Sequence, residues 1–272
     1  MTTFEGELRD LAVDLARRAG ALIREGRRTG TGVVDLKSTA TDMVTEYDRA
    51  SEQLIVTALR TARPDDAIIG EEGTADLGTS GIRWLIDPID GTTNFFYGLP
   101  GYAVSIAAAD DDGTIAGAVF VPATDEMFAA ARGEGATLDG AVIHCSTNHD
   151  LSRALVATGF SYHAERRRRQ MERLPHVIAE ISDIRRLGAA APDLCYVAAG
   201  RFDAYFEEFL APWDLAAGEL IAREAGCISG DLGGGPVRAE QVLVANPFLF
   251  VPLRDLIGRA DALAAAARGQ AH

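Results

Sequence analysis

The sequence predicts a mixed α/β fold made of two lobes that share one site. Three patterns predict it: amphipathic helical segments near the amino terminus, strand-like runs separated by turn residues in the first half, and strands alternating with helices in the second half. The chain has 272 residues and 47% hydrophobic content, enough for one large domain or two lobes with a common interface. We expect an amino-terminal lobe over residues 1–150 and a carboxy-terminal lobe over residues 151–272.

The amino-terminal lobe is expected to place helices over an antiparallel sheet. Leucines at helical spacing among acidic residues predict a charged amphipathic first helix, and a second helical pattern covers residues 44–58. Turn residues then separate three strand-like runs, at residues 102–109, 114–121 and 126–131. The acidic run at residues 110–112 is typical of a solvated hairpin turn.

The carboxy-terminal lobe alternates short strands with helices. The strand-like runs lie at residues 154–158, 202–206 and 242–245, and the helical stretches include residues 192–199 and 215–225. Four consecutive arginines, residues 166–169, lie in another helical stretch. Because neighbouring residues point in different directions around a helix, we interpret these arginines as a solvated face. A subunit contact or an anion site is the alternative.

The stretch WLIDPIDGTTNF combines an apolar run with two carboxylates and several turn residues. Residues 84–86 are typical of the end of a buried strand, and Pro88 is expected to stiffen a turn. Gly91 allows a sharp bend before a new element starts at Thr92 or Thr93. This order of residue types is typical of a metal-dependent phosphate site.

Asp87 and Asp90 therefore lie at the carboxyl end of a predicted strand, where they can bind a cation. Hard cations such as Mg²⁺ take oxygen ligands from one or two carboxylates, backbone carbonyls and water, and they leave room for substrate phosphate. Asp87, Asp90 and the Ile89 carbonyl can supply such ligands. If residues 91–93 open a helix, their N–H groups favour an anion at the same point. The alternative is a capped turn without a ligand.

Other acidic residues carry weaker signals of the same kind. Glu71 and Glu72 follow a short apolar run in a glycine-flanked loop, and a solvated acidic pair is the alternative. Thr45 and Asp48 are three residues apart in an amphipathic stretch, where they either cap the helix or relay a proton to water. Asp214 lies at the start of a strongly helical stretch, a position more typical of an N-cap than of a metal ligand.

Taken together, the blocks GEEG, DPIDGTTNF and PWDLAAGELIAREAG resemble the inositol monophosphatase family. All the signature blocks of that family occur in the family's order, and the resemblance spans nearly the whole chain. The match to DPIDGTTNF is specific, whereas GEEG by itself is a weak signal. The resemblance implies a layered αβαβα sandwich of helices and sheets, the fold of the inositol monophosphatases and fructose-1,6-bisphosphatases.

The resemblance also implies a site for two or three Mg²⁺ ions. Glu71, Asp87 and the Ile89 carbonyl would bind the first ion. Asp87, Asp90 and Asp214 would bind the second, and a third, looser ion would bind beside Glu71. The implied reaction is hydrolysis of a phosphate monoester by direct attack of a metal-activated water, without a phosphoenzyme.

By the same resemblance, the catalytic residues are Asp48, Thr92 and Glu71, and the first two orient and deprotonate the attacking water. The implied substrate contacts are Gly91, Thr92, Thr93, Gly188, Ala189, Ala190 and Glu207. The alcohol portion would lie against residues 188–190, with Glu207 accepting hydrogen bonds from its hydroxyls. The family often has Ser or Thr where this chain has Ala189, so one hydroxyl contact is missing or replaced by water. Taken without the family, Glu207 and Glu208 would be an exposed strand end.

These contacts favour inositol 1-phosphate or a related polyol phosphate as the substrate. The metal site binds the phosphate, and only the outer pocket contacts the alcohol. The alternatives are therefore phosphatases of the same fold that act on fructose 1,6-bisphosphate, 3′-phosphoadenosine 5′-phosphate or histidinol phosphate. Another class of function is a noncatalytic interaction protein that keeps the fold. The family likeness further implies inhibition by lithium and a homodimer.

Charge and cysteine content narrow the classes of partner. Forty acidic against 26 basic residues give a formal charge of −14, which opposes nonspecific binding to nucleic acid or to an anionic membrane. No apolar run reaches the ~18 residues of a membrane span. The three cysteines show no CxxC spacing and follow no signal peptide, so we expect a cytoplasmic protein with reduced thiols.

Overall fold

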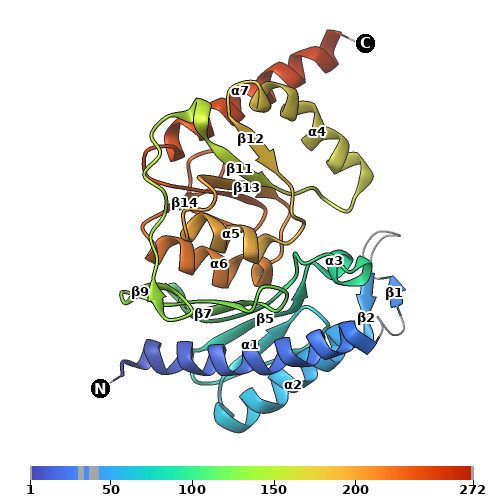
Figure 1. Ribbon diagram of the computed structural model, residues 1–272, viewed down its shortest axis with the longest axis vertical. Helices are drawn as coiled ribbons and strands as arrows, with labels where there is room; N and C mark the ends of the chain where they lie inside the picture. Colours follow the sequence, from blue (N-terminus) through green and yellow to red (C-terminus); the bar gives the residue numbers. More distant parts are fainter. Residues whose placement is uncertain (1, 30–33, 37–42, 271–272) are drawn as a thin grey trace.

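The computed structural model describes residues 2–29, 34–36 and 43–270, and it stacks helices and sheets in alternating layers (Figure 1). The helices of these layers are α1 (Phe4–Thr29) and α2 (Glu46–Ala62) on one side, α5 (Ala190–Ala198) and α6 (Pro212–Glu224) in the middle, and α4 (Ala164–Ile178) and α7 (Phe250–Gln270) on the other side. A sheet lies between each pair of helical layers. The predicted αβαβα sandwich is confirmed.

Apolar stripes on α1 and α2 cover the outer face of the larger sheet. Leu8, Leu15 and Ile23 of α1 are buried at spacings that keep to one face of a helix. In α2, Ile55 and Leu59 are buried one turn apart. These side chains form one hydrophobic core with the strands beneath them. Both predicted amphipathic helices are present, although α2 starts at Glu46 rather than at Val44.

Among the described residues, the larger sheet has eight strands in the order β10-β9-β8-β7-β6-β5-β3-β4. Their bounds are β3 (Ala67–Gly70), β4 (Ala75–Asp76), β5 (Arg83–Asp90), β6 (Ala103–Asp110), β7 (Gly113–Val121), β8 (Glu126–Ala131), β9 (Gly135–Leu138) and β10 (Ala141–Val142). All neighbours are antiparallel except β3 and β5. The predicted hairpin turn at residues 110–112 connects β6 to β7. A separate ribbon of β1 (Val34–Leu36) and β2 (Met43–Thr45) precedes α2.

Strand β5 runs further than the sequence predicts. We expected the strand to end before a turn at Pro88, but β5 continues to Asp90, and its pairing with β6 shifts between Asp87 and Asp90. Proline has no N–H to donate to a neighbouring strand, and an irregularity of this kind accommodates it. Both carboxylates still lie at the carboxyl end of the strand, as predicted.

Helices α5 and α6 lie between the two sheets and join them in one core. That core contains Phe128 of β8, Leu220 of α6 and Val244 of the smaller sheet. Helix α5 starts at Ala190, two residues before the predicted start. Pro192 is tolerated in the first turn because its missing N–H has no helical partner there. The middle layer, which comes from the predicted second lobe, thus packs against both sheets.

The smaller sheet has five strands among the described residues, in the order β12-β11-β13-β15-β14. Their bounds are β11 (Leu155–Thr158), β12 (Asp183–Arg185), β13 (Ala204–Glu208), β14 (Ile228–Gly230) and β15 (Gln241–Ala245), and a short helix η1 (Leu151–Arg153) precedes them. β13 starts at Ala204 rather than at Phe202, whose backbone N–H instead donates to the Tyr196 carbonyl at the end of α5. Helices α4 and α7 cover the outer face.

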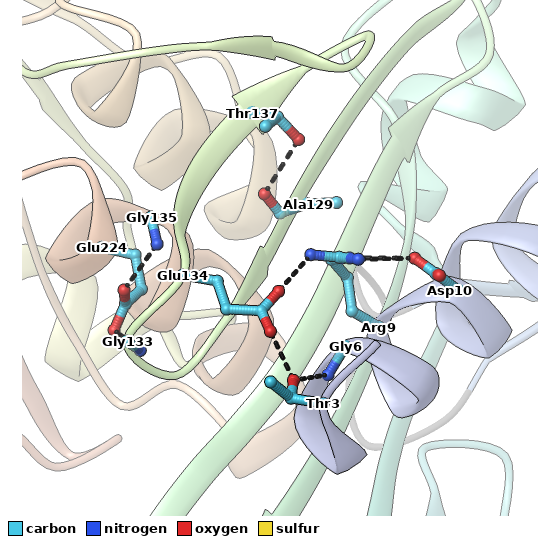
Figure 2. Close-up of polar contacts among 10 residues, drawn as sticks. All are labelled: Thr3, Gly6, Arg9, Asp10, Ala129, Gly133, Glu134, Gly135, Thr137 and Glu224. Atoms are coloured by element: carbon cyan, nitrogen blue, oxygen red, sulfur yellow. Dashed lines mark hydrogen bonds and ion pairs between the residues drawn. The ribbon is translucent and has the colours of Figure 1, made fainter. Parts of the chain in front are cut away.

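The turn between β8 and β9 ties the layers together (Figure 2). Glu134 in this turn accepts hydrogen bonds from Thr3 and from Arg9 of α1, the second at 2.6 Å. On the other side of the sheet, Glu224 at the end of α6 accepts from the backbone N–H groups of Gly133 and Gly135, both at 3.0 Å. One turn therefore contacts a helix on each face of the larger sheet.

In the part of the chain that the structure describes, no helix is both long enough and apolar enough to cross a membrane.

Candidate active site

A pocket of about 220 Å³ lies between the carboxyl end of β5 and the second lobe. The predicted site residues that line it are Glu71, Asp87, Ile89, Asp90, Gly91, Thr92, Gly188, Ala189, Ala190, Glu207 and Asp214. Two predicted residues, Asp48 and Thr93, do not line it. The structure thus gathers residues from distant parts of the chain around one cavity.

Asp87 and Asp90 are buried and held by backbone donors. An oxygen of Asp87 accepts from the Ile89 N–H at 3.0 Å, and an oxygen of Asp90 accepts from the Ala191 N–H at 2.6 Å. Ala191 lies in the first turn of α5, so Asp90 joins the larger sheet to the middle helices. The backbone therefore fixes both carboxylates while each keeps a second oxygen.

The charges in the pocket floor repel one another. Burial, followed by the charges of Glu71, Asp90 and Asp214, raises the pKa of Asp87 well above its usual value. Burial and the charge of Asp214 do the same to Asp90, against the hydrogen bond from Ala191. Acidic groups that lie together in a buried place are stabilised by a cation. The floor of the pocket is therefore electrostatically suited to divalent cations.

The chemistry of the donors fits Mg²⁺, although the geometry is not yet that of a bound ion. Among the described residues, no set of three or more His, Cys, Asp or Glu side chains is arranged to hold a metal ion as it stands. Glu71 lies close enough to Asp87 to raise the pKa of its carboxyl group. Glu71, Asp87, Asp90, Asp214 and the Ile89 carbonyl are the groups that could hold the cation.

Asp48 and Thr92 form a buried hydrogen-bonded chain beneath the pocket. The Thr92 hydroxyl lies 3.0 Å from Oδ1 of Asp48 and 2.9 Å from the Ile89 carbonyl oxygen. Oδ2 of Asp48 accepts from the backbone N–H and the hydroxyl of Thr45, at 2.8 and 2.5 Å. Burial raises the pKa of Asp48 in spite of these hydrogen bonds. Thr45 is the N-cap of α2, so the predicted cap and the predicted relay are parts of one arrangement.

Gly91 sets the direction in which α3 (Thr92–Tyr97) leaves the sheet. Its φ is +86°, and a Cβ at this position would lie 2.7 Å from the Gly101 carbonyl oxygen. Only glycine meets both conditions without strain. Thr92 and Thr93 are the first two residues of α3, so the predicted new element starts where expected.

Asp214 enters the pocket from the second lobe. It is the third residue of α6, and its carboxylate accepts from the Ala211 N–H at 2.8 Å. The sequence predicts an N-cap at Asp214, which is wrong, because Ala211 holds that position and Pro212 starts the helix. The carboxylate still caps the amino terminus by reaching back to it, as acidic residues in a first turn do.

Glu207 is half-buried rather than at an exposed strand end. Its carboxylate accepts from the Tyr205 hydroxyl at 2.6 Å, and burial raises its pKa to about 7. The neighbouring Glu208 forms an ion pair with Arg173 at 2.9 Å. The interpretation of both residues as exposed is therefore wrong, because the loop and helix α4 that precede β13 in the pocket wall cover them.

Sequence reasoning missed several residues of the pocket wall. They are Gly159, Phe160, Ser161, Tyr162, His163, Arg186, Glu208, Phe209 and Leu210. Arg166 also lines the pocket, and like Arg168 and Arg169 it is exposed, so the predicted solvated face includes one arginine that borders the pocket. In α5, a buried carboxyl oxygen of Asp193 has no hydrogen-bond partner among the residues that the structure describes. No local pattern distinguishes these residues from ordinary loop and helix positions.

Comparison with known proteins shows the family to which the chain is similar. The sequence model of the inositol monophosphatase family matches residues 5–269. The chain is 43% identical over 258 residues to inositol-1-monophosphatase of Mycobacterium leprae, covering 88% of this chain and 89% of that protein. It is 42% identical over 242 residues to the Nus factor SuhB of Vibrio cholerae, covering 88% and 91%. The crystal structure of extragenic suppressor protein suhB from Bartonella henselae matches with a TM-score of 0.88 and 36% identity, covering 92% of this chain and 98% of that one.

Proposed function

Since the chain belongs to the inositol monophosphatase family, we propose that it is a Mg²⁺-dependent phosphomonoesterase that hydrolyses inositol 1-phosphate or a related polyol phosphate. The observation that carries this proposal is the meeting of Asp87 and Asp90 of β5 with Asp214 of α6 and Glu71 around one pocket. Buried carboxylates that repel one another have no structural benefit unless a cation binds among them.

Each chemical role falls to residues in that pocket. Mg²⁺ bound by the carboxylates would offset the charge of the phosphate and lower the pKa of a water molecule. Thr92 would orient that water through its hydroxyl oxygen, and Oδ1 of Asp48 would take up the proton. Oδ2 of Asp48 is already engaged by two donors of Thr45, so Oδ1 is the oxygen left for this transfer.

The wall of the pocket would hold the alcohol. Ala189 and Ala190 are buried small residues beside Gly188, which has a φ of +94°. They leave space for the ring of the alcohol, and Glu207, which lines the same pocket, would accept hydrogen bonds from the hydroxyls of that ring. The hydroxyl of Tyr205 already donates to Glu207, which fixes the direction of that carboxylate.

A panel of phosphate esters tests the proposal. We would measure Mg²⁺-dependent phosphate release from inositol 1-phosphate, fructose 1,6-bisphosphate, 3′-phosphoadenosine 5′-phosphate and histidinol phosphate. Preference for inositol 1-phosphate is the expected result, and preference for another ester would keep the reaction but change the substrate. Release from none would favour a noncatalytic role.

Replacement Asp90→Asn tests the role of the carboxylates. The amide keeps an oxygen for the Ala191 N–H but removes one buried negative charge. We expect turnover to fall at least about 100-fold, since one cation ligand loses its charge. Without Mg²⁺ the variant should be as stable as wild type or more stable, because charge repulsion is relieved, and Mg²⁺ should raise the melting temperature of wild type more than that of the variant.

Asp111→Asn is the matched control for this variant. Asp111 lies in the β6–β7 turn with a side chain that is 91% exposed, outside the pocket. It should keep wild-type turnover and the wild-type response to Mg²⁺. Equal turnover in Asp90→Asn and wild type would contradict the proposed cation site.

A further inference from the structure

Two arginines line the pocket without being part of the proposed catalytic groups. Arg166 is the third residue of α4, and Arg186 directly follows β12. Both lie in the same pocket wall as Glu207 and Phe209. The described part of the chain shows no hydrogen bond or ion pair from either guanidinium to a protein acceptor. Their charges are therefore available to a ligand.

Arg166 is held in place by an aromatic ring. Its guanidinium carbon lies 4.3 Å from the centre of the Phe209 ring, within cation–π distance. Phe209 has a φ of +70°, a strained value for a bulky residue, and its N–H donates to the Glu240 carbonyl. Stacking engages the flat face of the guanidinium and leaves the N–H groups on its edge free to bind an anion.

Arg186 lies against the substrate side of the pocket. A Cβ placed on Gly188 would come within 2.5 Å of Nη1 of Arg186, so the glycine leaves room for the guanidinium there. Gly188 belongs to the segment proposed to contact the alcohol portion of the substrate. A positive charge is therefore placed beside the alcohol and not in the acidic floor where the reacting phosphate would bind.

The acidic residues of the wall do not neutralise this pair. Glu208 is already in an ion pair with Arg173 at 2.9 Å. Glu207 and Asp193 lie close enough to Arg186 to interact with its charge, but no ion pair forms between them. Arg166 has neither of these carboxylates as a partner. Two guanidinium groups thus line one cavity.

We propose that Arg166 and Arg186 form an anion-binding rim that strengthens the binding of an ester carrying a second anionic group, a phosphate or a carboxylate, on its alcohol portion, relative to the same ester without that group. The inference rests on the proposed phosphatase function for the identity of the first phosphate. Arginine presents planar pairs of N–H donors that match the oxygens of such groups. The rim would therefore favour a bisphosphate over the corresponding monophosphate.

A matched pair of esters separates the rim from the catalytic floor. We would measure kcat/KM for fructose 1,6-bisphosphate and fructose 1-phosphate, which differ only in the second phosphate, with wild type, Arg166→Gln and Arg186→Gln. The ratio of the two values, bisphosphate over monophosphate, should exceed one in wild type. It should fall about tenfold in each variant, since each loses a charge-assisted contact to the second phosphate.

Arg168→Gln controls for net charge. Arg168 lies on the same helix and is exposed outside the pocket, so its loss changes the overall charge equally without touching the rim. A ratio that falls as much in Arg168→Gln, or that does not fall in Arg166→Gln and Arg186→Gln, would overturn the inference. Thermal unfolding of each variant confirms that its fold is intact.

Failure of the proposed function gives a different result. The proposed function is wrong if wild type with Mg²⁺ releases phosphate neither from the two fructose esters nor from inositol 1-phosphate. Whenever the two fructose esters are not hydrolysed, the rim is judged by equilibrium binding of the same two esters. A ratio of affinities that falls in the two rim variants but not in Arg168→Gln would support the rim. An unchanged ratio would overturn it.

Discussion

Asp66 is a buried carboxylate outside the pocket, and it accepts hydrogen bonds from three side chains. The donors are Arg63 at 2.8 Å, Ser80 at 2.6 Å and the indole of Trp84 at 2.9 Å. Burial by itself raises the pKa of this carboxyl, but the hydrogen bonds from Arg63, Ser80 and Trp84 outweigh it and lower the pKa. The folded protein therefore favours the ionised form of Asp66.

Replacing Asp66 by Asn should lower the free energy of unfolding by about 1–3 kcal/mol at pH 7, because charged hydrogen bonds are lost. A carboxyl group whose pKa is lowered by folding contributes fully to the free energy of unfolding above its pKa in the unfolded chain, about 4. This contribution is lost as the pH falls through the pKa of the group in the folded protein. The difference between wild type and variant should therefore shrink below about pH 4. Urea unfolding of wild type and Asp66→Asn at pH 7 and at pH 3 measures this difference in the free energy of unfolding.

The exposed Asp111 again offers a control, since it forms an ion pair with Arg83 at the surface. Asp111→Asn should change the free energy of unfolding by less than about 1 kcal/mol, as surface pairs do. A difference between wild type and Asp66→Asn that stays the same from pH 7 to pH 3 would contradict the assigned shift.

At the scale of elements, α1 packs unusually close to the larger sheet at Gly20. A Cβ at this position would lie 2.2 Å from the ring of Phe120 in β7. Such a contact cannot be accommodated without moving the ring or the helix. The glycine is therefore required by packing, although glycine weakens a helix interior.

Gly20→Ala should lower the free energy of unfolding by about 1–3 kcal/mol, the usual cost of overpacking. Gly258 of α7 is the matched control, because a Cβ there meets nothing within 4 Å. Gly258→Ala should raise the free energy of unfolding by about 0.5–1 kcal/mol through better helix propensity. Chemical unfolding of both variants measures these changes, and effects of the same sign would contradict the packing argument.

At the scale of the whole molecule, the two predicted lobes share a hydrophobic core. Side chains from the larger sheet, from α5 and α6 and from the smaller sheet contact one another in one cluster. The β8–β9 turn adds polar contacts to α1 and to α6 (Figure 2). A core that spans both lobes should make them unfold together.

The two tryptophans of the chain report on this cooperativity separately. Trp84 lies in β5 of the first lobe and Trp213 in α6 of the second. In the variant Trp213→Phe the fluorescence comes from Trp84, and in Trp84→Phe it comes from Trp213. For each variant, we expect urea unfolding followed by fluorescence to have the same midpoint as unfolding followed by circular dichroism. Separate fluorescence and circular dichroism transitions within one variant would show that the lobes unfold independently.

By itself, the sequence determined the features that depend on neighbours a few residues apart. Helical spacing located α1 and α2, and the cap at Thr45 was readable because its partner Asp48 is three residues away. The carboxylates at the end of β5 were readable from one continuous motif, even though the strand continues through Pro88. Such patterns lie within one helix or strand, so they do not depend on how that element packs against the rest of the protein.

Only the tertiary structure decided which distant residues meet. The hydrogen bond from Ala191 to Asp90 joins residues 101 positions apart, and it depends on how α5 packs between the sheets. The rim of Arg166 and Arg186 likewise comes from two elements of the second lobe that face the floor of the first. The physical reason is that layer packing brings these groups together, and no periodicity or spacing along the chain records which faces of the layers come into contact.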